Sequence, residues 1–311
     1  MEMAGRILNF GSLNIDYVYT VEHIARNGET VASLDYQVFP GGKGLNQSAA
    51  LARAGAKVFH AGRIGKEGVF LKEALEAEGI DCRYLEVDDG ATGHAIIQRS
   101  VEGDNCIVLY PGANHRITRE AVDRVLQHFD ENDILVCQNE ISQVDYLIEA
   151  AFRRGMRIAW NPSPVTDVIS RVDCSMITWL VINEIEGQSI TGKAGPQEIL
   201  AELKQRYPQL TVVLTLGEAG SVCQWEDGLV RQSIFRVPVK DTTAAGDTFL
   251  GYLIAMTTEG PEHQSAPEWQ KLLETASMAS AIAVSKEGAM PSIPYREEVM
   301  KKLASTICLS E

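Results

Sequence analysis

Short runs of aliphatic and β-branched residues alternate with longer segments of helical periodicity along most of the chain. The strand-like runs include RILNFGS (6–12), KVFHAGRIG (57–65), DILVCQNE (133–140) and TVVLTLG (211–217). Apolar residues recur at helical spacing in GLNQSAALARAG (44–55), VDYLIEAAFRRG (144–155) and PQEILAELKQRYP (196–208). Strands that alternate with helices form a parallel sheet covered on both faces, because each parallel connection needs a crossover. This alternation predicts an α/β fold with a mostly parallel central sheet.

Two regions break the alternation, at residues 14–40 and 92–110. Both have period-two patterning without an intervening helix, and the second contains a turn signal, EGDN at 102–105. They predict a small β-sheet that stands off the main one as a lid or an oligomer surface. No repeat or linker divides the chain, so residues 1–311 are expected to form a single domain. The Pro-containing stretch 257–269 is expected to be a surface loop between two helices.

Composition places the chain among ordinary globular proteins. Of its 311 residues, 45% are hydrophobic and 23% are charged. No apolar run reaches the roughly 18 to 20 residues that span a bilayer, and the N-terminus lacks the basic and apolar segments of a secretory signal. We therefore expect a cytoplasmic protein without a membrane partner. The formal net charge of −14 has the wrong sign for binding nucleic acid through its phosphates.

Cysteine and histidine spacing gives no metal or disulfide pattern. The six cysteines lie tens of residues apart without a CxxC pair, which favours reduced structural thiols. The six histidines form no HxxxH or HExxH pair, so a transition-metal site is not expected.

Three short patterns that suggest nucleotides or modification are discounted. GQSITGKA (187–194) has the spacing of a P-loop, but Ala194 replaces the Mg²⁺-binding Ser or Thr, and the segment follows a helix-like pattern. The NQS sequon at Asn46 means little without a signal peptide. No GxGxxG follows the first predicted strand, which argues against a Rossmann-type dehydrogenase.

The stretch FPGGKGLNQSAALARAG (39–55) has the pattern of a glycine-rich turn that opens a helix. Its glycines would let a ligand approach the backbone, and the first helical turn would present unpaired N–H groups to it. Lys43 and Asn46 add a cation and an amide near that turn. The pattern indicates a binding site for a compound with several hydroxyl groups, and the alternative is a tight turn with an incidental lysine.

The stretch DTTAAGDTFLGYL (241–253) changes from small polar residues to an apolar helical pattern. Since FRVPVK (235–240) before it alternates like a strand, DTTAAGD is expected to be a strand-to-helix turn. Its small residues would leave N–H groups uncovered at the positive end of the helix dipole, where a phosphate is favoured. Asp247 would repel that phosphate unless it has a chemical task, and the fitting task is to accept a proton from an attacking hydroxyl. The alternative role for Asp247 is that of a helix N-cap.

Taken in this order, the two stretches resemble the ribokinase family of ATP-dependent sugar kinases, which includes fructokinases and adenosine kinases. The resemblance covers nearly the whole chain, from GSLNIDYV near the start through YPGAN (110–114), NEIE (183–186) and TLGEAG (215–220) to SKEGAMPSIP near the end. The lysine of GGKG and the PGAN segment are more similar to ribokinases than to the other members. The implied fold is a ribokinase-like three-layer α/β sandwich with a mostly parallel central sheet and a small β-sheet lid formed by residues 12–40 and 91–111.

The resemblance also implies residue roles, carried over position by position. The catalytic base falls on Asp247, and the anion hole on Ala244, Ala245 and Gly246. The sugar site matches Asn14, Asp16, Gly42, Lys43, Asn46 and Glu140. Contacts to ATP match Asn183, Glu186, Thr215, Gly217, Gly220 and Ser277, with the pair Asn183 and Glu186 helping to organise Mg²⁺. A site for a monovalent cation (K⁺) matches Asp241, Thr243, Ala283, Lys286, Gly288 and Ser292.

The implied reaction transfers the γ-phosphoryl group of ATP to the primary hydroxyl of a pentose, with D-ribose as the expected substrate and D-ribose 5-phosphate as the product. A related kinase for 2-deoxyribose, another small sugar or a nucleoside is the alternative. Polar Asn139, where many ribokinases carry a hydrophobic residue, leaves the preferred sugar open, and small Ser277 does the same for the nucleotide. A sugar-sensing protein without activity is a third hypothesis, against which the intact Asp247 and Lys43 argue. The edges of the lid predict a homodimer that pairs through it.

Overall fold

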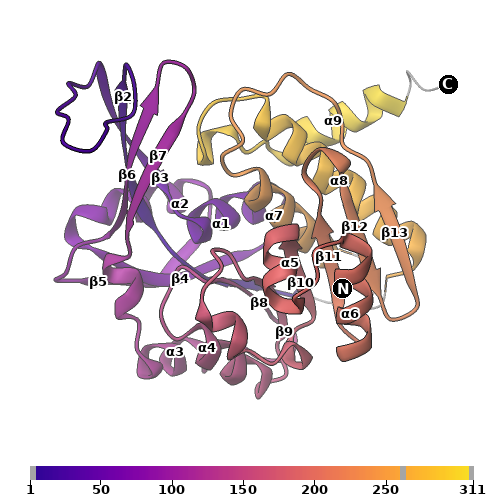
Figure 1. The fold of residues 1–311 in the computed structure, drawn as a ribbon. Helices are drawn as coiled ribbons and strands as arrows, with labels where there is room; N and C mark the ends of the chain where they lie inside the picture. Colours follow the sequence, from indigo (N-terminus) through magenta and orange to yellow (C-terminus); the bar gives the residue numbers. More distant parts are fainter. Residues whose placement is uncertain (1–4, 260–263, 308–311) are drawn as a thin grey trace.

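The computed structural model describes residues 5–259 and 264–307, and a large sheet forms its centre (Figure 1). Within these residues the sheet has nine strands in the order β13-β12-β11-β10-β9-β8-β1-β4-β5. The strands from β11 to β5 run parallel to their neighbours, whereas β12 and β13 form an antiparallel edge. The expected α/β class and the mostly parallel central sheet are confirmed.

Within the described residues, four strands of this sheet, namely β4, β8, β10 and β13, are followed by an α-helix before the next strand. The strands of the sheet are β1 Ile7–Phe10, β4 Val58–Gly65, β5 Asp81–Asp88, β8 Ile134–Gln138, β9 Arg157–Asn161, β10 Trp179–Asn183, β11 Thr211–Thr215, β12 Ser221–Trp225 and β13 Gly228–Gln232. The α-helices are α1 Lys43–Arg53, α2 Val69–Ala77, α3 Arg119–Leu126, α4 Val144–Phe152, α5 Glu184–Thr191, α6 Pro196–Arg206, α7 Ala245–Thr257, α8 Ala266–Val284 and α9 Arg296–Ile307.

Helices cover both faces of the large sheet, which gives the three layers of the sandwich. One buried cluster joins α1, α2, α7, α8 and α9 to one face, and the other joins α3, α4 and α6 to the opposite face. Adjacent residues of a strand enter different clusters, as Ile7 and Leu8 do in β1. This is why the strands are continuously apolar in sequence. None of the helices in the described ranges combines the length and the apolar character needed to cross a bilayer.

A second, smaller sheet has the strand order β3-β2-β6-β7 and projects from the body of the molecule above α1 and α2 (Figure 1). Its strands are β2 Asn14–Val21, β3 Asp35–Gly41, β6 Gly93–Ser100 and β7 Asn105–Tyr110. β6 and β7 form the hairpin predicted around EGDN. The smaller sheet predicted from the two period-two regions is therefore confirmed, and we refer to these four strands as the lid sheet.

One predicted strand is wrong. Residues 233–240, which contain FRVPVK, run as mostly exposed coil between β13 and α7. Pro238 has no N–H to offer a sheet, and the N–H groups of Lys240 and Asp241 donate to the carbonyl of Val284 at the end of α8. An alternating sequence makes a strand only where another strand pairs with it.

The predicted loop 257–269 was also too long, because α7 ends at Thr257 and α8 begins at Ala266. Residues 260–263 lie outside the described residues.

Candidate active site

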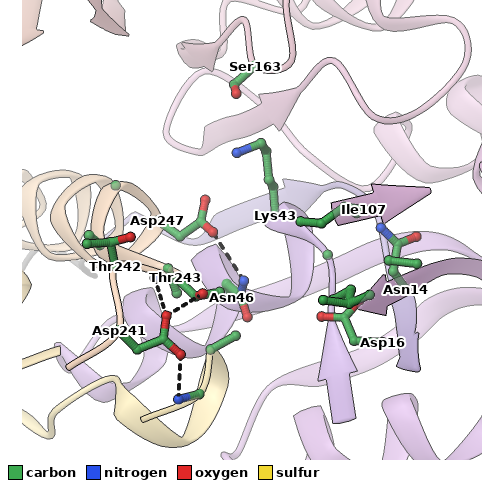
Figure 2. Close-up of a pocket in the computed structure, with 18 of the residues that line it drawn as sticks. Asn14, Asp16, Lys43, Asn46, Ile107, Ser163, Asp241, Thr242, Thr243 and Asp247 are labelled. Atoms are coloured by element: carbon green, nitrogen blue, oxygen red, sulfur yellow. Dashed lines mark hydrogen bonds between the residues drawn. The ribbon is translucent and has the colours of Figure 1, made fainter. Parts of the chain in front are cut away.

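A cavity of about 1070 Å³ opens between the lid sheet and the carboxyl ends of the large sheet's strands. Its walls are the inner face of the lid sheet, the first turns of α1 and α7, and the ends of β9, β10 and β11. Parallel sheets bind ligands at this edge, because the loops that follow the strands meet there. Figure 2 shows that Asn14 and Asp16 lie on one side of this cavity and Asp247 and Asp241 on the other.

The first turn of α7 presents an open backbone to the cavity. Ala244, the residue before the helix, has φ of 61°, a left-handed conformation that alanine rarely adopts. Gly246 lines the cavity, and no atom outside its own helix and chain neighbours lies within 4 Å of where a Cβ would stand. The N–H groups of a helix's first turn have no carbonyl partners inside the helix and carry its positive dipole end. This turn is therefore suited to an anion, as the sequence pattern predicts.

Asp247 lies in that same turn and is only 7% exposed. Its Oδ2 accepts a hydrogen bond from Asn46 Nδ2 at 3.1 Å, and its Oδ1 accepts one from Gln47 Nε2 at 2.9 Å. Both donors come from α1, which packs directly against α7. Asp247 does not act as a side-chain N-cap, since the cap position is Ala244. The carboxylate is thus fixed by side chains and keeps lone pairs for a ligand in the cavity.

The sugar-site residues of the lid sheet lie at its base, where β2 meets the body of the protein. Asn14 pairs with Gly41 on one side and Gly93 on the other. A Cβ at Gly41 would lie 2.0 Å from Asp16 Oδ2, and one at Gly93 would lie 2.4 Å from Asn14 Oδ1. Asn114 Nδ2 donates to Asn14 Oδ1 at 2.8 Å and orients it. A larger residue at either glycine would therefore force these polar side chains to move.

Lys43 and Glu140 form the floor between the two sides. Lys43 is the first residue of α1, and its N–H donates to Glu140 Oε2 at 3.0 Å. Ser12 Oγ donates to the same oxygen. Burial alone would lower the pKa of Lys43, but the carboxylates of Asp247 and Glu140 outweigh it and raise that pKa. The lysine therefore stays charged, and Figure 2 shows its side chain beside Asp247.

Asp16, in the cavity wall, is an acidic group with a shifted pKa. Burial raises its pKa to about 7, and the nearby Glu140 carboxyl contributes to the rise. Burial likewise raises the pKa of Glu140, while the charge of Lys43 opposes that rise. A buried carboxylate without a compensating partner is costly, which is typical of a group kept for binding.

We expect Asp16→Asn to raise the free energy of unfolding above pH 7 by up to about 4 kcal/mol, since one pKa unit corresponds to about 1.4 kcal/mol. The folded pKa of about 7 lies above the ordinary value of 3.8. The charged form therefore destabilises the wild-type fold above pH 7, and the penalty fades as the pH falls toward 4. Denaturant unfolding of both proteins at pH 8 and pH 4 measures the difference.

The matched control for this measurement is Asp104→Asn, an exposed aspartate in the β6–β7 turn of the same sheet. It should leave the stability of the protein unchanged at both pH values. Equal stability of wild type and Asp16→Asn at pH 8 would contradict the assigned environment of Asp16.

The residues predicted to contact the nucleotide are only partly brought together at the cavity. Asn183, Glu186 and Thr215 line the cavity. Asn183 caps α5, its N–H and Nδ2 donate to the two oxygens of Glu186, and the N–H of Glu186 donates back. Gly217, Gly220 and Ser277 are not among the residues that line the cavity. The P-loop-like segment GQSITGKA includes the end of α5 and its C-cap at Gly192. It is therefore not a loop between a strand and a helix, as a phosphate-binding P-loop is.

The predicted cation site is held together by Asp241. Its Oδ1 accepts hydrogen bonds from the N–H and Oγ1 of Thr243, and its Oδ2 accepts one from the N–H of Gly288 (Figure 2). Burial would raise the pKa of Asp241, but these hydrogen bonds outweigh it and lower that pKa. Asp241, Thr243 and Gly288 line the cavity, whereas Ala283, Lys286 and Ser292 lie outside its lining.

Asn139 does not reach the cavity that contains the predicted sugar-site residues, although its polarity suggested an effect on the choice of sugar. Its Nδ2 donates to the carbonyl of Pro164, and its Oδ1 accepts the indole N–H of Trp160. The side chain is 4% exposed and does not line the cavity. Its role in the described residues is to connect β8 to the loop after β9.

Motif reading missed three residues that hold this site. Asn114 orients Asn14, Gln47 donates to Asp247, and Asn161 accepts a hydrogen bond from Gln47. The sequence contained a signal for two of them, because Asn114 ends the PGAN segment and Gln47 directly follows Asn46. Asn161 carries no such signal, since it becomes a neighbour only when β9 and α1 pack together.

Comparison with known proteins agrees with this architecture. The family model described as pfkB family carbohydrate kinase matches residues 4–296. This chain belongs to the pfkB family of carbohydrate kinases. It is 33% identical to a ribokinase of Haemophilus influenzae over 94% of this chain and 96% of that one.

Two solved structures place this carbohydrate kinase near ribokinases within the family. A ribokinase of Cryptococcus neoformans in complex with ADP has a TM-score of 0.81 and 32% identity, covering 96% of this chain and 99% of that one. A ribokinase of Arabidopsis thaliana complexed with ribose and ATP has a TM-score of 0.82 and 27% identity, covering 96% and 98%. The ribokinase-like fold expected from the resemblance is thereby confirmed.

Proposed function

We propose that this carbohydrate kinase phosphorylates D-ribose at its O5 hydroxyl with ATP as the phosphoryl donor. The observation that carries the proposal is the position of Asp247, a carboxylate fixed at an open helix N-terminus and facing the same cavity as Asn14 and Asp16. A base beside an anion-binding turn, opposite groups that bind hydroxyls, is what phosphoryl transfer to an alcohol requires. The similarity to ribokinases, one of them solved with ribose and ATP, supports ribose as the acceptor.

In the proposed reaction, the polar groups of the lid base hold the ring hydroxyls and place O5 beside Asp247. Asp247 takes the O5 proton as the bond from O5 to the γ-phosphorus forms and the bond from that phosphorus to the bridging oxygen of ADP breaks. The first turn of α7 and the charge of Lys43 stabilise the negative charge on the transferring group. The products are D-ribose 5-phosphate and ADP, with the proton on Asp247.

Mg²⁺ is part of this proposal because the donor set fits it. Glu186 supplies a carboxylate at the cavity wall. Each carboxylate oxygen accepts a hydrogen bond from Asn183 and retains a lone pair for a metal ion. Mg²⁺ prefers oxygen ligands, and an ion held near Glu186 would supply positive charge to offset the negative charge of the ATP phosphates. The contribution of this chain is that the capping box holds the Glu186 carboxylate in place before any ligand arrives.

The lid sheet is proposed to close over the sugar. Its inner face carries apolar Ile107 and Leu109 above the polar base, so closure would exclude the water that competes as phosphoryl acceptor.

We propose that residues 1–311 act as one kinase domain, with the lid formed by residues 12–40 and 91–111. We also propose that the enzyme is cytoplasmic, with sugar and ATP as its partners.

The test of the function is ADP production from Mg-ATP with D-ribose, 2-deoxyribose, fructose and adenosine in parallel, in potassium buffer. Ribose is expected to give the highest kcat/KM. An analogue that lacks a bonded hydroxyl should be poorly used, since it leaves buried polar groups unpaired. A higher kcat/KM with another acceptor would overturn the ribose assignment. Absence of ADP production with all four acceptors, together with tight sugar binding, would instead favour the sugar-sensing hypothesis.

Activation by a monovalent cation is expected from the oxygen-rich Asp241 loop. The backbone and side-chain oxygens near Asp241 suit K⁺, and the loop joins the α7 turn to residues 286–288. We expect K⁺ to raise kcat several-fold over a bulky organic cation at equal ionic strength, and Asp241→Asn to reduce that ratio. Equal turnover in both salts would contradict the proposed site.

We expect the protein to form a homodimer through the outer face of the lid sheet. Tyr36, Val38, Val108 and Tyr110 are 42% to 62% exposed on this face. Exposed apolar residues on a sheet with open edges favour pairing with another sheet. Val108→Glu is expected to shift sedimentation at micromolar concentration from dimer to monomer, whereas Leu229→Glu on β13 should not. A monomeric wild type would remove the proposal.

A further inference from the structure

Asp247 is the end of a chain of buried amide side chains that the proposed mechanism does not use. Gln47 Nε2 donates to Asp247, and Gln47 Oε1 accepts a hydrogen bond from Gln138 Nε2 at 2.7 Å. Gln138 Nε2 also donates to Asn9 Oδ1 at 3.0 Å, and Asn9 Nδ2 donates to the carbonyl of Gly44 at 2.7 Å. The three amide side chains are at most 1% exposed. Burying such a set of polar groups costs free energy of folding, and a function for the set would explain why it is present.

The direction of these hydrogen bonds is fixed at the far end of the chain. A backbone carbonyl only accepts, so Gly44 requires the NH₂ group of Asn9 on its side. The carbonyl of Asn9 must then face Gln138, which places the NH₂ group of Gln138 toward both Asn9 and Gln47. Gln47 consequently turns its carbonyl to Gln138 and its NH₂ group to Asp247.

A second constraint acts on Gln47 from the opposite side. Asn161 Nδ2 donates to the carbonyl of Val181 at 3.0 Å, which again only accepts. This leaves Asn161 Oδ1 facing Gln47 Nε2 at 3.3 Å. Two independent backbone carbonyls therefore require the same orientation of the Gln47 amide, with its N–H groups toward Asp247 and Asn161.

We propose that Gln47 is a positioning residue, whose amide is oriented by Gln138, Asn9 and Asn161 so that it holds the Asp247 carboxylate in place for proton transfer. The proposal rests on the proposed function, because it assigns Asp247 the role of base. Gln47 does not line the cavity, so it acts on the reaction through Asp247 and not on the sugar. A carboxylate that rotates freely spends less time aligned with O5, and small misalignments reduce rates strongly.

The test compares Gln47→Met with wild type and with the control Ser48→Ala. Methionine keeps the volume of Gln47 but removes its donor. Ser48 is equally buried on α1 and is hydrogen-bonded to Asn9 and His60. Without the Ser48 hydroxyl, the carbonyl of Gly44 still orients the amide of Asn9. We expect Gln47→Met to lower kcat about 10- to 100-fold, with KM for sugar and ATP almost unchanged. Ser48→Ala should keep the wild-type kcat while lowering the thermal midpoint.

A second variant, Gln138→Met, keeps the proposal testable if Gln47→Met does not fold. It removes the donor that orients Gln47 without touching Asp247, and kcat should fall less than in Gln47→Met, again at constant KM. Wild-type kcat in a folded Gln47→Met, or an equal fall of kcat in Ser48→Ala, would overturn the positioning role of Gln47. Wild-type kcat in a folded Gln138→Met would overturn the part of the proposal that assigns orientation of Gln47 to Gln138. An inactive wild type on every acceptor would instead count against the proposed function, so the two failures are distinguishable.

Discussion

Asp247→Asn is expected to lower kcat by about 10²- to 10⁴-fold, the usual contribution of a general base. Asparagine has almost the shape of aspartate but does not accept the O5 proton at neutral pH. The KM values for sugar and ATP should change little, because the lid base and the α7 turn remain intact. Steady-state kinetics with D-ribose and Mg-ATP, measured as ADP formation, gives both constants.

Asparagine at position 247 should still fold, for a reason visible in the structure. Its new NH₂ group would face a donor, either Asn46 Nδ2 or Gln47 Nε2. Asn46 is able to turn its amide, since its Oδ1 is buried without a hydrogen-bond partner in the described residues. A thermal midpoint close to wild type therefore accompanies the kinetic loss. If kcat stays within a few-fold of wild type in the folded variant, Asp247 is not the base.

Gly246→Ala is expected to lower kcat by at least about 100-fold, comparable with the loss of one oxyanion-hole donor. The added methyl group meets no atom within 4 Å outside its own helix and chain neighbours, and it would take up space in the cavity that Gly246 lines, next to the proposed anion site. Gly246 lies in a helix and has no positive φ, so alanine is conformationally acceptable there and should stabilise the protein by up to about 1 kcal/mol. The expected result is lower activity with an unchanged or higher thermal midpoint.

Gly251→Ala, one turn later in α7, provides the contrast. A Cβ at Gly251 would lie 2.3 Å from the Cβ of Ala50 in α1, so this variant should lose stability through overpacking. Thermal unfolding and kinetics of the two variants, measured together, separate a blocked anion site from a damaged core. Full activity of Gly246→Ala would remove the α7 turn from the proposed mechanism.

The elements were predictable from sequence where local chemistry decides structure. Alternating strand and helix segments gave the α/β class, and period-two patterning gave the lid sheet with its hairpin at 102–105. The glycine-rich turn before α1 and the small residues before α7 marked the two helix N-termini that meet at the cavity. FRVPVK failed because the strand pattern says nothing about whether a neighbouring strand exists to pair with it.

Residue types at motif positions by themselves determined which groups could carry chemistry here, because a carboxylate, a lysine and bare glycine backbone have the same donors and acceptors in any fold. Only the tertiary structure decided how they act together. It brought Asn46 and Gln47 of α1 onto Asp247, which is about 200 positions later in the chain. It also buried Asp16 enough to move its pKa, and it turned Asn139 away from the cavity. Burial, hydrogen-bond direction and contact between distant segments depend on packing, which no local pattern encodes.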